Sequence, residues 1–117
     1  MLLNRLLSEL VALRQKREIS AIDLVTESLD VIENLNGSLG AFISVREHEE
    51  ALAAAREADG NTGARFSGIP YSLKDAFVTT ELPTTAGSSV LHNYRSPYDA
   101  TLHAKLKQAG AILVGKN

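Results

Sequence analysis

The chain has 117 residues, with 12 Lys or Arg, 14 Asp or Glu, and no cysteine. The balanced charge argues against a nucleic-acid-binding stripe, and the missing cysteines exclude disulfides, thiol catalysis and thiolate metal sites. No apolar run approaches the roughly 20 residues of a membrane span, and the leucine-rich start lacks a signal-peptide core. We therefore expect one globular unit, or a piece of one, in a cytoplasmic protein.

The N-terminal third is predicted to form two helices. Leucines recur at helical spacing within residues 2–15. Ser20–Asp23 is a capping-box arrangement that opens a second helix, and Asn36–Gly37 is expected to end it. Residues 1–37 are thus interpreted as a helical pair that precedes the start of an α/β core over residues 41–117.

A strand, a helix and another strand are predicted next. AFISV, residues 41–45, is the first strand candidate. Ser44 and Glu47 form a capping-box pattern, which predicts an alanine-rich helix over residues 45–58. The short apolar segment Ile69–Leu73 is the second strand candidate.

The remaining sequence predicts a crossover between parallel strands. Residues 79–98 contain two prolines and many hydroxyl side chains, which is typical of a long loop. Asp99 is expected to cap a helix to about Ala109 with Leu102 facing inward, and residues 111–115 form an apolar strand. A strand, an excursion, a helix and a strand make a right-handed βαβ unit. The fold class is therefore α/β, with helices on a mixed, largely parallel sheet.

The sequence stops directly after this last strand, although a parallel sheet needs further strands. We interpret it as a truncated part of a larger domain. The exposed sheet edge expected along residues 111–115 would offer a second copy of the chain a place to pair, which makes a homo-oligomer an expected assembly.

The most informative stretch is GIPYSLKDAF, residues 68–77, in which Lys74–Asp75 interrupt an apolar segment at the end of a predicted strand. Sites in open parallel sheets form at the carboxyl ends of strands. A lysine that is partly desolvated there has a lowered pKa and can act as a general base. The alternative is a solvated lysine whose neighbouring aspartate makes a surface ion pair or caps a turn.

Other polar residues are weaker candidates. Ser88–Ser89 lie in AGSS, outside the strand-to-helix G-x-S-x-G turn of serine hydrolases, so we interpret them as loop residues. His48, His92 and His103 are too scattered to suggest paired metal ligands, and neither a metal nor a cofactor is expected. Gly115–Lys116 alone is too little for a phosphate-binding loop.

Three segments together resemble the N-terminal part of the amidase signature family. They are GIPYSLKD at residues 68–75, PTTAGSS at residues 83–89 and PYDATLHAKLKQAGAILVGKN at residues 97–117. Their order and spacing are similar to the family throughout, and the resemblance covers essentially the whole chain. Within the family the chain is most similar to the A subunits of tRNA-dependent amidotransferases.

The resemblance implies a Ser-cis-Ser-Lys amidohydrolase. In this family a lysine accepts a proton through a bridging serine, a second serine attacks the amide carbonyl, and backbone N–H groups bind the oxyanion. The family's lysine matches Lys74, whereas both serines belong to a Gly/Ser-rich segment downstream of residue 117. The chain alone is therefore expected to be inactive. Asp75, Thr85, Gly87 and Ser88 are expected beside the site or in structural roles.

The same resemblance implies glutamine as the substrate and the other amidotransferase subunits as partners, with no direct nucleic-acid binding by this segment. Two alternatives remain open. One is a general amidase that acts on other amides, and the other is a stand-alone, non-catalytic α/β interaction module.

Overall fold

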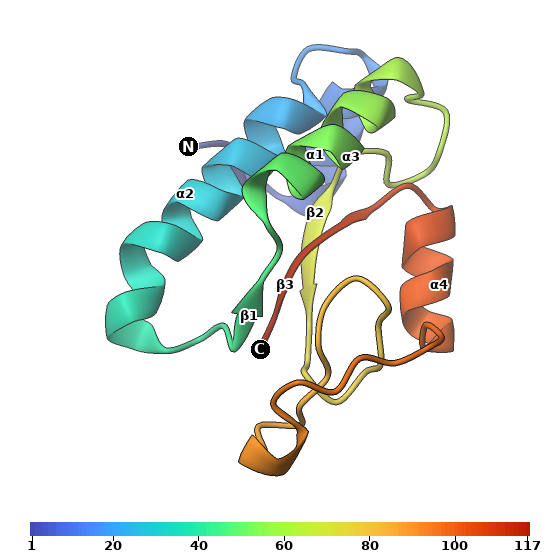
Figure 1. Cartoon of the computed structure of the whole chain (residues 1–117). Coiled ribbons are helices and arrows are strands. Elements are labelled where there is room, and N and C mark those ends of the chain that lie inside the picture. Colours follow the sequence, from blue (N-terminus) through green and yellow to red (C-terminus); the bar gives the residue numbers. More distant parts are fainter.

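A computed structural model describes all 117 residues and has one three-stranded sheet flanked by helices (Figure 1). The strand order is β1-β3-β2, with β2 parallel and β1 antiparallel to β3. The predicted α/β class with a mixed sheet is thus confirmed. The elements are η1 (Leu2–Asn4), α1 (Leu7–Gln15), α2 (Ala21–Leu39), β1 (Ser44–Val45), α3 (His48–Gly60), β2 (Pro70–Leu73), η2 (Ser89–Leu91), α4 (Thr101–Gln108) and β3 (Ile112–Lys116).

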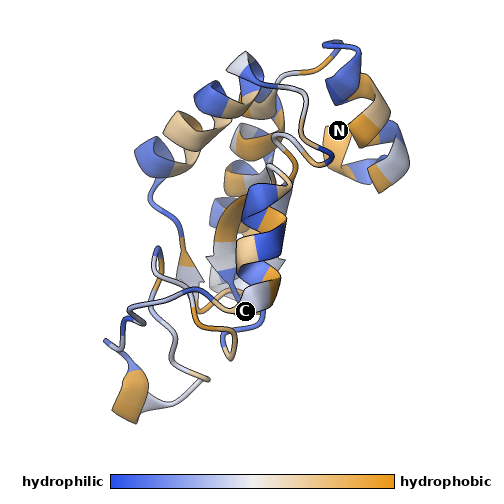
Figure 2. Cartoon of the chain, turned by 90° about the vertical axis from the view of Figure 1, so that its right-hand side faces the viewer, coloured by the Kyte–Doolittle hydropathy of each residue, from blue (hydrophilic) through white to orange (hydrophobic).

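The sheet is the middle of three layers. Helices α2 and α3 pack against Ile112 and Val114 of β3. On the other side, Leu73 and Leu113 are buried and Leu106 of α4 packs against them. Figure 2 looks onto this second side, with α4 in front of the strands. The loop between β2 and α4 therefore lies at the end of the sheet where the parallel strands finish (Figure 1).

The ladder between β2 and β3 contains a bulge. Tyr71 is opposite Leu113, but the next pair is Ser72 with Gly115, so Val114 is an extra residue in β3. An extra residue reverses the alternation of side chains between the two faces of a strand beyond that point. The bulge therefore decides which way the last residues of β3 point.

Arg14 joins the N-terminal helices to the sheet layer. Its side chain is only 3% exposed. It donates from Nε to the carbonyl oxygen of Ser67 at 3.1 Å and from Nη1 to Asp59 Oδ1 at 2.5 Å. The same Asp59 carboxylate accepts from the backbone N–H of Ala21 at 2.7 Å. One ion pair thus connects α1, the first turn of α2 and the end of α3.

The continuous helix predicted over residues 2–15 is wrong. Arg5 and Leu6 have extended backbone angles, which split the segment into η1 and α1. Of the predicted leucine stripe, Leu10 is the buried member. The leucine spacing therefore overstated the length of the helix, because it did not show the backbone break.

The predicted start of α2 is confirmed and its predicted end is too early. Ser20 Oγ accepts from the N–H of Asp23 at 2.9 Å, and Asp23 Oδ2 accepts from the N–H of Ser20 at 3.2 Å. The helix continues through Asn36–Gly37 and ends at Gly40, whose φ of 60° suits a glycine.

The capping box predicted at Ser44 is wrong. Ser44 belongs to β1 and pairs with Lys116 of β3, and the strand predicted over residues 41–45 is reduced to its last two positions. Helix α3 begins later, where the Glu47 side chain accepts from the N–H of Glu50 at 3.1 Å. The long-range pairing of Ser44 prevents it from opening the helix.

The cap predicted for α4 is also wrong. Asp99 Oδ1 accepts from the N–H of Thr80 at 2.7 Å, so this carboxylate fixes the long loop instead of the helix. Leu102 is 44% exposed, and the inward position belongs to His103, which is 1% exposed.

The exposed edge predicted along residues 111–115 is wrong, because β3 is paired on both sides and is the central strand. The free edges belong to β1 and β2. No helix combines the length and the apolar character that crossing a bilayer demands.

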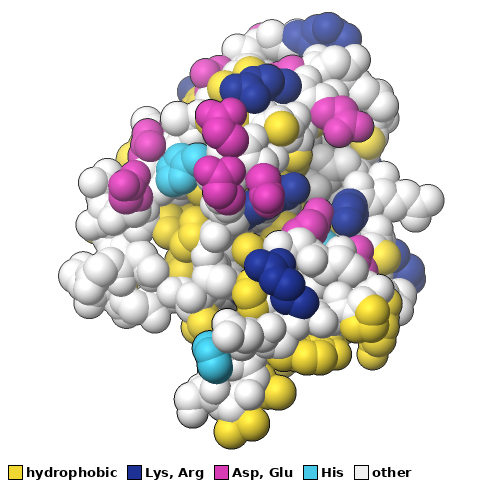
Figure 3. Space-filling model, in the orientation of Figure 1, with side chains coloured by type: hydrophobic (Ala, Val, Ile, Leu, Met, Phe, Trp, Pro, Cys, Tyr) yellow, Lys and Arg dark blue, Asp and Glu magenta, His cyan; other side chains and the backbone are white.

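Apolar side chains gather on the loop that contains η2. Figure 3 shows hydrophobic atoms at the lower end of the molecule, over this loop. Exposed apolar residues in or near η2 and in the chain leading to α4 are Val90, Leu91, Tyr94 and Tyr98. We call these four residues the apolar tip.

Candidate active site

The parallel strands β2 and β3 end side by side, and each has a lysine at its end. The N–H of Asn117 donates to the carbonyl of Leu73 at 2.9 Å, and the N–H of Asp75 donates to the carbonyl of Asn117 at 2.6 Å. Lys74 comes directly after β2, and Lys116 is the last residue of β3. This edge is where parallel sheets form sites.

Asp75 is buried at this edge and holds the loop that follows. It is 2% exposed. Its Oδ2 accepts from the N–H of Thr85 at 3.0 Å and also from the Thr85 hydroxyl. Its backbone carbonyl accepts from the N–H of Ala86 at 2.7 Å. Asp75 and Thr85 together pin residues 83–88 across the ends of the strands.

Lys116 completes the cluster. It is fully buried, and its Nζ lies 3.2 Å from Asp75 Oδ1. Burial lowers the pKa of Lys116, and the Asp75 charge opposes this shift. Sequence reasoning missed this role, because it considered Gly115–Lys116 as a phosphate-binding loop and as part of the third family motif, and not as a buried charge. The available signal was a lysine that continues an uninterrupted apolar strand.

Lys74 occupies the predicted position but not the predicted environment. We expected partial desolvation, whereas its side chain is exposed and forms no hydrogen bond or ion pair in the chain. Lys74 opens a turn in which the N–H of Phe77 donates to its carbonyl oxygen at 3.0 Å, and in this turn Asp75 takes the buried side. Ser72, two positions earlier, is exposed like Lys74.

Gly87 and Ser88 form a turn beside this cluster. Ala86 and Gly87 have φ values of 50° and 69°. The N–H of Gly87 donates to the Thr85 hydroxyl at 3.2 Å. Ser88 Oγ accepts from the N–H of Val90 at 3.3 Å, at the start of η2. The Ser88 hydroxyl therefore supports the turn, and no histidine or lysine side chain hydrogen-bonds to it.

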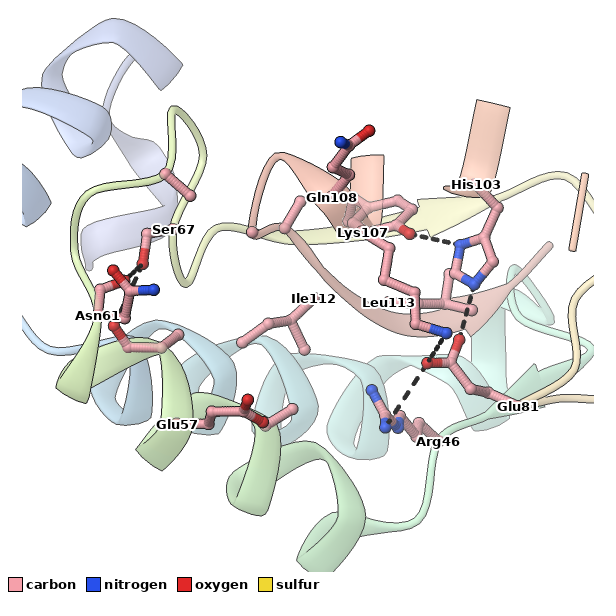
Figure 4. Close-up of a pocket in the computed structure, with 16 residues that line it drawn as sticks. Arg46, Glu57, Asn61, Ser67, Glu81, His103, Lys107, Gln108, Ile112 and Leu113 are labelled. Carbon is pink, nitrogen blue, oxygen red and sulfur yellow. Dashed lines mark hydrogen bonds and ion pairs between the residues drawn. The ribbon is translucent and has the colours of Figure 1, made fainter. Parts of the chain in front are cut away.

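A pocket of about 430 Å³ lies elsewhere, between α3 and α4 (Figure 4). Lys74, Asp75 and Thr85 do not line it. Three of its basic side chains meet Glu81, whose carboxylate lies 2.7 Å from His103 Nε2, 3.2 Å from Lys107 Nζ and 3.9 Å from Arg46 Nη2. These groups bind one another, which makes the pocket a structural junction of loop, helix and sheet.

His103 is bonded at both ring nitrogens in this junction. Its Nδ1 lies 2.6 Å from the Tyr71 hydroxyl and its Nε2 faces Glu81. A neutral ring that accepts from the tyrosine and donates to the carboxylate satisfies all three groups. Burial, followed by the charges of Glu81 and Asp99, raises the pKa of Tyr71 above its usual range. No three histidine or carboxylate side chains gather as metal ligands do.

The family profile described as Amidase matches residues 23–117. This chain belongs to the amidase family. The resemblance inferred from the three motifs is therefore confirmed, and the chain corresponds to the N-terminal portion of the family's domain.

Individual relatives agree with this assignment. The glutamyl-tRNA(Gln) amidotransferase A subunit of Aromatoleum aromaticum is 45% identical over 119 residues, which cover 98% of this chain and 24% of the relative. The native peptide amidase of Stenotrophomonas maltophilia matches with a TM-score of 0.85 at 31% identity and covers 94% of this chain and 24% of that amidase. The glutamyl-tRNA(Gln) amidotransferase A subunit of Thermotoga maritima matches with a TM-score of 0.67 at 37% identity, over 82% of this chain and 19% of that protein.

The shares of each relative that this chain covers show how much of an amidase domain it represents. The chain spans about a quarter or less of the length of each relative. The amidase relationship and the fold are thus established for this portion, while the reaction belongs to a proposal.

Proposed function

We propose that this chain is the lysine-bearing N-terminal part of a Ser-cis-Ser-Lys amidohydrolase. The observation that carries the proposal is the position of Lys74, which belongs to the GIPYSLKD motif and directly follows β2 at the edge where the parallel strands end. The membership of residues 23–117 in the amidase family supports it.

In this proposal Lys74 is the base of a proton relay. It accepts, through a bridging serine, the proton of a second serine that attacks the amide carbonyl, while backbone N–H groups bind the oxyanion. The exposed Lys74 amine suits this role, because the remainder of the domain would supply the serine that contacts it. Residues 1–117 lack the family's Gly/Ser-rich segment, so we expect no turnover from this chain alone.

The proposed substrate is the side-chain amide of glutamine, from which the enzyme releases ammonia for a tRNA-dependent amidotransferase. The support is the 45% identity to the glutamyl-tRNA(Gln) amidotransferase A subunit of Aromatoleum aromaticum. The other amidotransferase subunits are then the proposed partners, and the cytoplasm is the proposed location.

A second candidate is an amidase that acts on other amides. One observation favours it: the backbone matches the Stenotrophomonas maltophilia peptide amidase with a TM-score of 0.85, against 0.67 for the Thermotoga maritima amidotransferase protein. The two candidates share Lys74 and the relay, and they differ in the amide that is bound.

A grafted enzyme tests the proposal. Residues 1–117 replace the matching N-terminal segment of the Aromatoleum aromaticum relative, and ammonia release is measured with glutamine and with a peptide amide. We expect turnover of glutamine, and we expect Lys74→Ala to lower kcat about 10²- to 10⁴-fold, the usual contribution of a general base. The exposed Lys105→Ala is the matched control.

Two results would contradict the proposal. A Lys74→Ala graft that keeps the rate of the Lys105→Ala graft would remove Lys74 from the chemistry. Turnover by the 117-residue chain itself, abolished by Lys74→Ala, would show that the nucleophile lies within this chain. A graft that prefers the peptide amide would select the second candidate.

A further inference from the structure

Lys116 is a buried side chain whose amine is surrounded by oxygen atoms. Its Nζ lies 2.6 Å from Thr84 Oγ1, 3.1 Å from the carbonyl oxygen of Pro83 and 3.2 Å from Asp75 Oδ1. An ammonium group has three N–H donors and no acceptor. Lys116 donates two of them to Thr84 Oγ1 and the Pro83 carbonyl, and Asp75 Oδ1 lies within ion-pair distance of the same nitrogen. The site is therefore built for a charged lysine, although the burial of the residue disfavours charge.

Both oxygens of the Asp75 carboxylate have neighbours on the same side. Lys116 faces its Oδ1, and both the N–H and the hydroxyl of Thr85 donate to its Oδ2. Lys74 is its sequence neighbour, yet the two side chains form no ion pair. Asp75 is thus adjacent in sequence to the proposed base Lys74, but its carboxylate faces Lys116 and Thr85 instead.

The bulge in β3 makes this arrangement available. Lys116 pairs with Leu73, so its side chain shares a face with Leu73, and its Nζ reaches Asp75 Oδ1 on that face. With regular alternation from Ile112 and Val114, Lys116 would point instead toward α2 and α3. Bulges commonly re-aim a side chain beside an active site.

We propose that Lys116 is a positioning residue, which holds the Asp75 carboxylate on the loop side of β2 and thereby keeps it from pairing with Lys74. The inference rests on the proposed function of Lys74. A lysine acts as a base only when it is neutral, and an adjacent carboxylate that pairs with it stabilises the charged form. Lys116 takes the carboxylate and leaves the Lys74 amine free.

Amine labelling of the 117-residue chain tests this. Lys74 and Lys105 are both exposed, and a brief pulse of acetic anhydride acylates their neutral amines at rates that peptide mass spectrometry measures in one sample. We expect Lys116→Met to lower the Lys74-to-Lys105 labelling ratio about two- to fivefold, the effect of a new solvent-exposed ion pair. The double variant Lys116→Met with Asp75→Asn should restore the ratio.

A purely structural role for Lys116 gives a different result. Loosening the loop cannot slow the labelling of a lysine that is already exposed, so an unchanged ratio in a folded Lys116→Met chain overturns the proposal. Folding is checked by circular dichroism. If Lys116→Met does not fold, Lys116→Gln takes its place with the same expected and overturning ratios.

The unmodified chain supplies a measurement that needs no variant. Lys116 should be acylated at least about 50-fold more slowly than Lys105, because two hydrogen bonds, an ion pair and complete burial protect its amine. Equal labelling of Lys116 and Lys105 would show that the contacts of the Lys116 amine with Asp75, Thr84 and Pro83 do not persist in solution, which overturns the proposal.

The grafted enzyme separates this inference from the proposed function. We expect Lys116→Met to lower kcat for glutamine severalfold with little change in KM, and the double variant to recover part of the loss. A graft that is indifferent to Lys74→Ala defeats the proposed function and leaves the labelling result standing. An unchanged labelling ratio defeats this inference and leaves the role of Lys74 standing.

Discussion

At the scale of single residues, Arg14 offers the clearest stability prediction. Its guanidinium is buried and pairs with Asp59. Arg14→Met leaves the Asp59 carboxylate without its partner, and breaking a buried pair from one side is strongly destabilising. Because the Asp59 side chain is 24% exposed, we expect a loss of about 2–3 kcal/mol in the free energy of unfolding, measured by urea denaturation.

A matched control separates this effect from the loss of any surface cation. Lys16 is an exposed residue next to the same helix. Lys16→Met should change the free energy of unfolding by less than about 0.5 kcal/mol. Equal effects of Arg14→Met and Lys16→Met would mean that the Arg14 pair contributes nothing.

Asp99 gives a prediction about pH. Although burial acts to raise its pKa, the hydrogen bonds from Thr80 and the charge of Lys107 outweigh it, and the pKa of Asp99 is lowered. A lowered folded pKa stabilises the protein above the unfolded value of about 3.9, and this stability is lost as the pH falls through the folded pKa. Asp99→Asn should therefore destabilise the chain at pH 7, and the difference should narrow below about pH 4.

Urea denaturation at pH 7 and at pH 3 measures this difference, with Asp30→Asn as the control. Asp30 is exposed on α2 and has no ion-pair partner. An Asp99→Asn chain whose deficit is the same at both pH values would show that the Asp99 charge does not contribute to folding.

The two lysines at the strand ends show what sequence can reveal at this scale. The position of Lys74 followed from an apolar segment that stops at a charge, which is a local pattern. The burial of Lys116 depends on the bulge at Val114 and on a loop that is distant in sequence. Neither feature has a local signature, so the sequence could place both lysines at one edge of the sheet but could not show which of them is buried.

At the scale of elements, Gly115 controls the pairing of β1 with β3. A Cβ at this position would lie 2.6 Å from Phe42 Cδ1 and 2.8 Å from the carbonyl oxygen of Ser44. Gly115→Ala must therefore push β1 away from β3. We expect faster hydrogen exchange at the N–H groups of Ile43 and Arg46, which donate to Lys116 and Val114, and a loss of about 1–3 kcal/mol in the free energy of unfolding.

Gly37→Ala is the matched control, because nothing lies within 4 Å of a Cβ at this exposed position of α2. Alanine in a helix is preferred over glycine by about 0.5–1 kcal/mol, so this substitution should stabilise the chain. If Gly115→Ala leaves the two exchange rates unchanged, the close approach of Phe42 does not persist in solution.

The same contrast explains which element boundaries could be predicted. Ser20 caps α2 through groups three residues away, and the sequence pattern identified it. Ser44 and Asp99 carry similar patterns, but their partners are Lys116 and Thr80, far along the chain. Capping rules take only neighbouring residues into account, and tertiary pairing overrides them.

At the scale of the whole molecule, the fold class was predictable because strand, loop, helix and strand force a βαβ unit. The sheet order was not. The antiparallel β1 pairs with β3 across more than sixty positions of sequence, and two-residue strands carry too little pattern to predict their partner. The central place of β3 moves the free edges to β1 and β2, so any self-association through strands would use those edges.

The apolar tip carries the last prediction, which concerns the surface of the molecule as a whole. Val90 is 88% exposed and Tyr98 is 64% exposed, and exposed apolar patches promote association. Val90→Ser removes apolar area that folding does not bury, so the free energy of unfolding should change by less than about 0.5 kcal/mol. Self-association, measured by sedimentation over a concentration series, should weaken at the same time.

Val25→Ser is the opposite case, because Val25 of α2 is completely buried in the core that α2 forms with α3 and β3. It should cost about 2–4 kcal/mol through lost burial and a buried hydroxyl, without reducing association of the folded chain. The pair of variants divides apolar residues that hold this chain together from those that face outward. A Val90→Ser chain that loses more than about 1 kcal/mol would place the tip among the residues that stabilise the fold, and an unchanged sedimentation profile would remove it as an association surface.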